Sequence, residues 1–258
     1  MLIFFRVIVL FFILIYSFNV NSKPLVSSDW LEDKVCKDGF IVLEVYRSKK
    51  NYEVSHIPCS VFTNFYESGW RETRDNIPMS IPETRKLVKV IEMHGISNSD
   101  HVIISAPGTG KYDAAETAAI YFTFKYLGHE KVSILNGGFK AWEKKWDRDL
   151  ENGFNAIKKG KFEANLNNEI IANKVEVKEL IDTKGYLVDA RPSDMYLGIN
   201  ISFPALKNGT IPNSLNIPNN WLLKNSTLYF QDEEELEELK SRIDKRKQVE
   251  YKYQNQAP

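Results

Sequence analysis

The sequence predicts an α/β fold in which a parallel sheet is flanked by helices, with one complete domain followed by an incomplete second domain. Apolar runs of strand length alternate with segments of helical periodicity that end at glycine. This alternation is typical of a parallel sheet covered by helices on both faces. The opening order of elements then starts again after residue 174, which indicates a divergent internal duplication.

The first half of the chain supplies a full set of elements for one sheet. Its expected strands are runs rich in β-branched and aromatic residues, at residues 40–46, 61–62, 101–105 and 131–135. The run at 101–105, HVIIS, is the expected central strand. Its expected helices follow capping or turn residues, at residues 30–35, 82–94, 113–127 and 139–145. These elements place the first domain at residues 23–147.

The second half repeats only the opening elements. Residues 148–174 are polar and without strong periodicity, so they are expected to form a linker. A helix at 175–182, a strand at 185–190, a loop with a short strand at 208–217 and a charged helix at 232–247 are expected within a truncated second domain at 175–258. No segment of the second half is expected to form the central strand of this second sheet. Residues after about 173 should therefore be loosely packed, or depend on a partner that supplies the strand.

The first 22 residues are expected to be a signal peptide. The apolar run from Val7 to Tyr16 has the length of a signal-peptide core and is short for a spanning helix, and Ser22 suits a cleavage site. A membrane-anchoring, uncleaved leader and a mitochondrial presequence are the alternatives. Glycosylation sequons begin at Asn200, Asn208 and Asn225 and favour the secretory pathway or the extracellular space.

The charged residues exclude one class of partner. Lys plus Arg and Asp plus Glu number 34 each, so the chain has no basic footprint for nucleic acid. The two cysteines, Cys36 and Cys59, are too few for a zinc site or a disulfide scaffold. Whether they pair in an oxidising compartment stays open, with Cys36 expected late in a short helix. No metal and no cofactor are expected.

Several motifs, found in order over residues 25–223, resemble the tandem rhodanese family of thiosulfate and 3-mercaptopyruvate sulfurtransferases. The first domain contributes LVSSDWLEDKV, YEVSHIPCSVF and YLGHEKVSILNGGFKAW, and the second contributes YLVDARPSDMYLG and GTIPNSLNIP. Most of these residues are expected to specify the fold rather than the chemistry. His56 is expected to be structural, Gly137 and Gly138 to allow a tight turn, and Asp189 to brace a loop.

The resemblance implies a chemistry for which this chain lacks the main residue. In the family, a cysteine thiolate in a strand-to-helix loop of the second domain becomes a persulfide. Here Ala106 occupies about that position in the first domain, and the second domain's loop is missing, so no catalytic residue is expected. Arg191 matches a family arginine that binds the anionic sulfur donor, whereas Met195 and Thr210 replace a second arginine and a histidine.

Three functional hypotheses follow from this comparison. The first is a binding pseudoenzyme that takes a small anionic sulfur compound or a protein partner. The second is an active sulfurtransferase, either through an unexpected thiol or because this chain is a truncated form of a longer enzyme. The third is a fragment without function. Cys59 is a poor substitute nucleophile, because it follows a proline turn instead of preceding a helix.

The loop SAPGTGKYD, residues 105–113, has a superficial likeness to a nucleotide-binding loop. A true P-loop needs glycine where Ser105 stands and a hydroxyl residue where Tyr112 stands, so nucleotide hydrolysis is excluded. Backbone amides at a helix start can still hold an anion. The residues expected to do so are Gly108, Thr109, Gly110 and Lys111.

Overall fold

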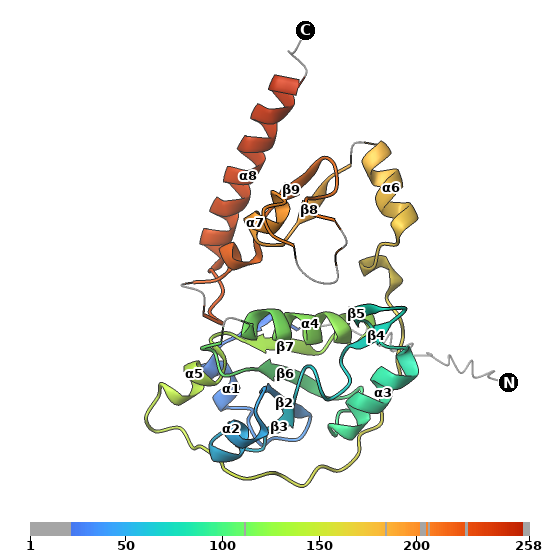
Figure 1. The fold of residues 1–258 in the computed structure, drawn as a ribbon. Coiled ribbons are helices and arrows are strands. Elements are labelled where there is room, and N and C mark those ends of the chain that lie inside the picture. Colours follow the sequence, from blue (N-terminus) through green and yellow to red (C-terminus); the bar gives the residue numbers. More distant parts are fainter. Residues whose placement is uncertain are drawn as a thin grey trace, which may run out of the picture.

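The computed structural model describes residues 22–110, 112–183, 185–201, 205, 207–224 and 227–254, with side chains to residue 243. Residues 1–21 of the expected leader, Lys111 and Asn225 lie outside the described residues. Figure 1 shows a sheet with its helices in the lower part, and a smaller group of elements with one long helix above it.

The lower part is built on a five-stranded sheet, in the order β1-β7-β6-β2-β3. The strands are β1 (Leu25–Val26), β2 (Phe40–Val45), β3 (Val61–Thr63), β6 (His101–Ser105) and β7 (Val132–Leu135). All neighbouring pairs run parallel. β6 pairs with β2 on one edge and β7 on the other, so the predicted central position of HVIIS is confirmed.

Helices cover both faces of this sheet, as expected for parallel strands. They are α1 (Ser28–Glu32), α2 (Lys49–Val54), α3 (Thr84–Met93), α4 (Asp113–Tyr126) and α5 (Gly138–Glu143). Successive side chains of β6 point to opposite faces of the sheet, and this alternation decides which helices each one contacts. Val102 and Ile104 pack in the cluster that contains α3 and α4, whereas Ile103 packs with Leu31 of α1 and Trp142 of α5.

Three features of the first domain were not expected from the sequence. They are the edge strand β1, the helix α2 and the antiparallel hairpin of β4 (Glu72–Arg74) and β5 (Ile77–Ser80). The hairpin turns at Asp75 and Asn76, which have φ values of 52° and 63°. Two such residues in succession are typical of the tight turn that matches the twist of paired strands.

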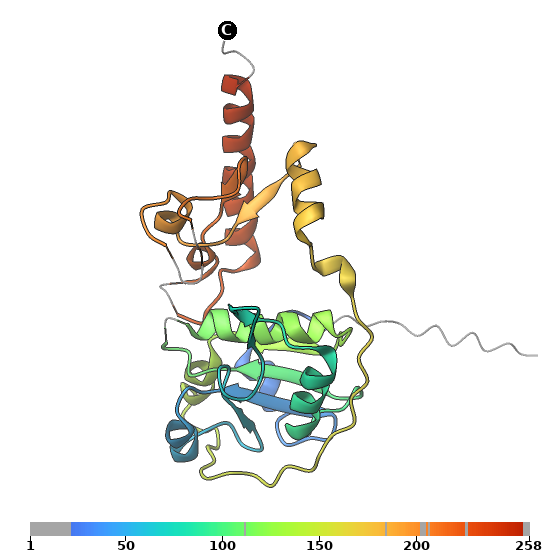
Figure 2. The ribbon, with the colours of Figure 1, turned by 45° about the vertical axis from the view of Figure 1, so that its right-hand side comes forward.

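The segment expected to be a linker is largely part of the first domain. Residues 151–167, here called the belt, run in extended form along its surface (Figure 2). The Gly160 amide donates to the carbonyl of Glu92, and the Asn165 amide donates to that of Leu127. Phe162 is 5% exposed and joins the main core. The first folded unit therefore extends to about residue 167, beyond the predicted boundary at 147.

The remaining elements form the second unit. They are η1 (Asn168–Ile170), α6 (Lys174–Asp182), β8 (Leu187–Asp189), α7 (Ser193–Tyr196), β9 (Ser214–Asn216), η2 (Asn219–Leu222) and α8 (Glu233–Gln254). β8 pairs with β9 in parallel, and within the described residues no other strand joins them. Neither α6 nor α7 has a buried residue. In the part of the chain that the structure describes, this unit has little core of its own.

Candidate functional site

The loop at residues 106–113 connects the central strand β6 to the start of α4. This is where ligands bind in open parallel sheets, because strand ends and helix N-termini meet there. Ala106, at the position of the family cysteine, is 1% exposed. The loop therefore presents a buried methyl group in place of a thiol.

The backbone amides of this loop converge on a carboxylate of the chain itself. The N–H groups of Gly108, Thr109 and Gly110 donate to Oδ2 of Asp113 at 2.7, 3.1 and 2.9 Å. Asp113 is nearly buried. These three amides were expected to hold an external anion, and the structure corrects that expectation, because Asp113 already satisfies them. The fourth residue of the predicted site, Lys111, lies outside the described residues.

A short segment of the second unit closes over the same loop. Residues Thr227–Phe230, here called the strap, place Leu228 in the main core beside Ala106 with no exposed surface. The Gly137 amide donates to the Leu228 carbonyl at 3.1 Å, and the Phe230 amide donates to Oδ1 of Asn136 at 2.9 Å. The strap thus covers the position in the first unit that corresponds to the family's reactive cysteine.

The glycine pair beside the strap has two roles. Gly137 and Gly138 both have a positive φ, as the predicted tight turn requires. A Cβ atom on Gly138 would also overlap the Ala106 carbonyl and the Leu228 side chain, and one on Gly137 would overlap the ring of Tyr229. Because Gly137 and Gly138 have no side chain, they leave room for the strap and also allow the turn.

The arginine identified by resemblance lies at the end of β8 and is bound to a neighbouring acid. Nε of Arg191 donates to both Asp189 oxygens, at 3.0 and 3.1 Å, and its Nη2 also donates to the Gly209 carbonyl. The side-chain hydrogen bonds from Arg191 to Asp189 lower the pKa of Asp189 to about 2. Asp189 further accepts from the Arg191 amide and the Thr210 hydroxyl, so its predicted role as a loop brace is confirmed. The Asp189 carboxylate therefore neutralises the positive charge that Arg191 would otherwise offer to an anionic sulfur donor.

The first unit has an acidic residue, Glu44, in the place that Asp189 holds in the second unit, and the sequence analysis did not identify it. Leu43 pairs with Val61, and Val188 pairs with Leu215, so the next residues along, Glu44 and Asp189, occupy matching places. Oε1 of Glu44 accepts from the Ile57 amide at 2.7 Å, in the turn before β3. The Glu44 side chain has no exposed surface, and burial raises its pKa to about 8. The only signal in the sequence was an acid inside an apolar run.

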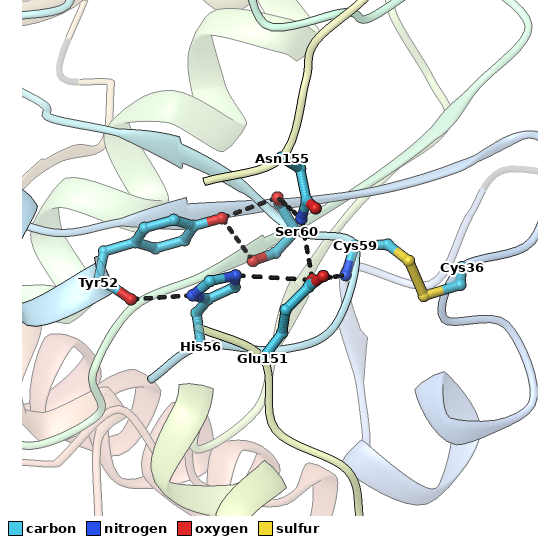
Figure 3. Close-up of a disulfide and its surroundings, with 7 residues drawn as sticks. All are labelled: Cys36, Tyr52, His56, Cys59, Ser60, Glu151 and Asn155. Atoms are coloured by element: carbon cyan, nitrogen blue, oxygen red, sulfur yellow. Dashed lines mark hydrogen bonds and ion pairs between the residues drawn. A yellow bond between two sulfur atoms is a disulfide. The ribbon is translucent and has the colours of Figure 1, made fainter. Parts of the chain in front are cut away.

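His56 is a structural residue, as expected (Figure 3). It is fully buried, its Nδ1 lies 2.9 Å from the Tyr52 carbonyl, and its ring stacks on that of Tyr52 at 4.0 Å. Its Nε2 lies 3.6 Å from Oε2 of Glu151. A buried imidazole enclosed in this way has no route to a substrate.

The two cysteines form a disulfide, which answers the question left open by the sequence. Cys36 lies beyond the end of α1, in a turn, so its expected place late in a helix is wrong. Cys59 lies in the turn before β3, as expected. No group of three or more potential metal ligands occurs among the described residues.

Comparisons with known proteins agree with this geometry. The rhodanese-like domain family matches residues 27–145. Rat thiosulfate sulfurtransferase is 28% identical over 220 residues, covering 78% of this chain and 70% of the relative. The sulfur carrier protein TtuD of Thermus thermophilus is 30% identical over 209 residues, covering 77% and 70%.

The fold is also that of a solved sulfurtransferase. The crystal structure of SseA from Escherichia coli, a 3-mercaptopyruvate enzyme with the rhodanese fold, matches with a TM-score of 0.68 at 22% identity. The match covers 84% of this chain and 81% of SseA. Taken with the parallel sheet, the loop after β6 and the repeated acid braces, these similarities show that the chain belongs to the rhodanese family, among the homologues of thiosulfate and 3-mercaptopyruvate sulfurtransferases.

Proposed function

We propose that this chain is a binding member of the rhodanese family that does not itself transfer sulfur. The observation that carries the proposal is that the chain's only cysteines, Cys36 and Cys59, are joined in a disulfide, while the loop after β6 has Ala106 at the corresponding position and its amides hold Asp113. Persulfide formation needs a thiolate stabilised by such amides. Both cysteines are instead joined in a disulfide away from this loop.

A protein partner is the better supported of the two proposed ligands. A small anionic sulfur compound would have to compete with Asp189 for Arg191 and with Asp113 for the loop amides. The second unit, by contrast, exposes large apolar side chains, with Tyr186, Leu197 and Ile199 each more than 60% exposed. A contiguous apolar surface marks a protein interaction site, and we propose that these side chains contribute to one.

Sulfur-transfer assays test the proposal directly. The protein would be incubated with thiosulfate and cyanide, and separately with 3-mercaptopyruvate and a thiol. Thiocyanate and sulfide should form no faster than with the Cys36→Ser/Cys59→Ser double variant. Turnover that disappears in the double variant would show that one of these cysteines carries sulfur and would refute the proposal.

The alternative is an active thiosulfate or 3-mercaptopyruvate sulfurtransferase of which this chain forms part. The name of the rat relative favours it, since that protein is a thiosulfate sulfurtransferase. Under this alternative the reactive thiol lies outside these 258 residues. Protein isolated from its source would then turn over thiosulfate while the recombinant chain would not.

We also propose that the protein enters the secretory pathway. The leader, the sequons and the disulfide support this location, and Asn200 and Asn208 are exposed. No helix among the described residues is long and apolar enough to span a bilayer. Expressed in a eukaryotic secretory cell, the protein should lose about 22 residues. N-glycosidase should lower its mass.

A variant with glutamine at all three sequon asparagines is the control for glycosylation. It should show no mass change with the glycosidase. Recovery of unshifted wild-type protein from mitochondria would instead support the presequence alternative.

A further inference from the structure

The Cys36–Cys59 disulfide joins two exposed residues on the surface of the first unit. It links the connection between α1 and β2 to the turn before β3, across a sequence separation of 23 residues. Both cysteines are exposed. A dithiol or a disulfide in solution can therefore reach the bond.

Both cysteines have a backbone conformation that a side chain disfavours. The φ values of Cys36 and Cys59 are 60° and 57°, in the left-handed region. In the second unit, Asn213 occupies the place that corresponds to Cys59 and has a φ of 64° without any such bond. Asparagine tolerates this region much better than cysteine does. The turn thus requires a left-handed residue, and at Cys59 it has a residue that disfavours this region and carries a disulfide.

The same turn anchors the start of the belt (Figure 3). The Cys59 amide donates to Oε2 of Glu151 at 2.6 Å, and Nδ2 of Asn155 donates to the same oxygen at 2.9 Å. His56 and Glu151 also exchange backbone hydrogen bonds in both directions, at 2.9 and 3.0 Å. Because β3 fixes the chain after Cys59, a change of this φ would tilt the peptide plane that carries the Cys59 amide and so disturb its bond to Glu151.

We propose that the Cys36–Cys59 disulfide is a redox-operated clasp that locks the start of the belt onto the first unit. A thiol–disulfide oxidoreductase closes it: the two cysteine S–H bonds and the S–S bond of the oxidant break, and the protein disulfide and two thiols on the oxidant form. A dithiol reverses this exchange. When the clasp opens, Cys59 leaves the left-handed region and its amide turns away from Glu151. An oxidising compartment keeps the clasp closed.

Hydrogen exchange on the whole chain tests the clasp, with a matched pair of variants. In the oxidised protein the amides of residues 59 and 151 should be protected. Dithiothreitol, or the Cys36→Ser/Cys59→Ser variant, should speed their exchange about tenfold or more. The Cys36→Ser/Cys59→Gly variant should keep the protection, because glycine holds a positive φ without a bond. The amides of β6 report global unfolding, so they should respond alike in the reduced protein and in both variants, because all three lack the bond.

Three results would overturn the clasp. If the reduced protein keeps residues 59 and 151 protected, the bond does not control the belt. If the glycine variant loses protection as fully as the serine variant, the left-handed backbone is not the link. If the amides of residues 59 and 151 speed up only by the same factor as those of β6, the bond stabilises the whole fold and is not a local device.

Discussion

The Glu44→Gln variant should be more stable than the wild type at neutral and alkaline pH, and its advantage should grow by about 1.4 kcal/mol for each pH unit between pH 5 and 8. Glutamine keeps the acceptor that Glu44 offers to the Ile57 amide. It removes the carboxyl group, so this buried position on β2 can no longer ionise.

The sign follows from the raised pKa of the buried acid. Glu44 titrates at about 8 in the folded protein, against 4.5 for an ordinary glutamate, because burial disfavours its charged form. Between these two values the unfolded chain has lost its proton while the folded protein keeps it. Stability therefore falls as the pH rises through this window and levels off above about 8. The full effect is a few kcal/mol.

Urea unfolding of both proteins at a series of pH values would measure this difference. Glu67→Gln, which changes an exposed acid of the same unit, is the matched control and should show no growing advantage. A constant difference between Glu44→Gln and the wild type from pH 5 to 8 would mean that Glu44 ionises normally in the folded state.

The parts of the fold that follow local patterns could be predicted from the sequence. HVIIS has the β-branched composition of a buried strand, and β6 occupies those five residues. The helix predicted at 113–127 ends at Tyr126, because Gly128 with a φ of 77° closes it. Both signals lie within a few residues of the element that they specify.

The belt and the strap could not be predicted, because single residues hold them to distant partners. Phe162 is the only belt residue among the buried residues of the main core in the described chain, and Ala164 packs against that core, but two apolar residues are too few to make a periodic pattern. Leu228 packs beside Ala106, more than a hundred residues away in the sequence. Neither contact leaves a local signal.

The sequence predicted where the candidate site lies, but it did not predict that the loop amides are already bound to Asp113. The glycines of the loop pointed to converging amides, and the structure has them. The residue that occupies them, Asp113, stands three positions after Gly110 and was interpreted only as the start of a helix. A carboxylate at that spacing can bond back to the preceding amides, as capping residues do. Composition alone does not say whether it turns toward solvent or toward the loop.

Hydrogen exchange should differ by at least about a thousandfold between β6 and β8 in the isolated monomer. The amides of β6 lie in a strand paired on both edges, and Val102, Ile103 and Ile104 have no exposed surface. Such amides exchange only when the whole domain unfolds. β8 has one partner among the described residues, and Val188 is 54% exposed. Its amides should exchange through local opening.

β2 is the internal control, because it holds the place in the first unit that β8 holds in the second. Leu43 of β2 pairs with Val61 on one edge and Ile104 on the other, whereas the matching Val188 pairs with Leu215 alone. If the second neighbour is what confers protection, β2 should exchange as slowly as β6 although its sequence pattern resembles that of β8.

Limited proteolysis should give the same division. The packed belt should protect the chain to about residue 167, with the first cuts between there and β8. A partner that pairs with β8 should slow both its exchange and this cleavage. If the monomer protects residues 187–189 as strongly as residues 101–105, the second unit folds on its own and the inference that it lacks a sufficient core is wrong.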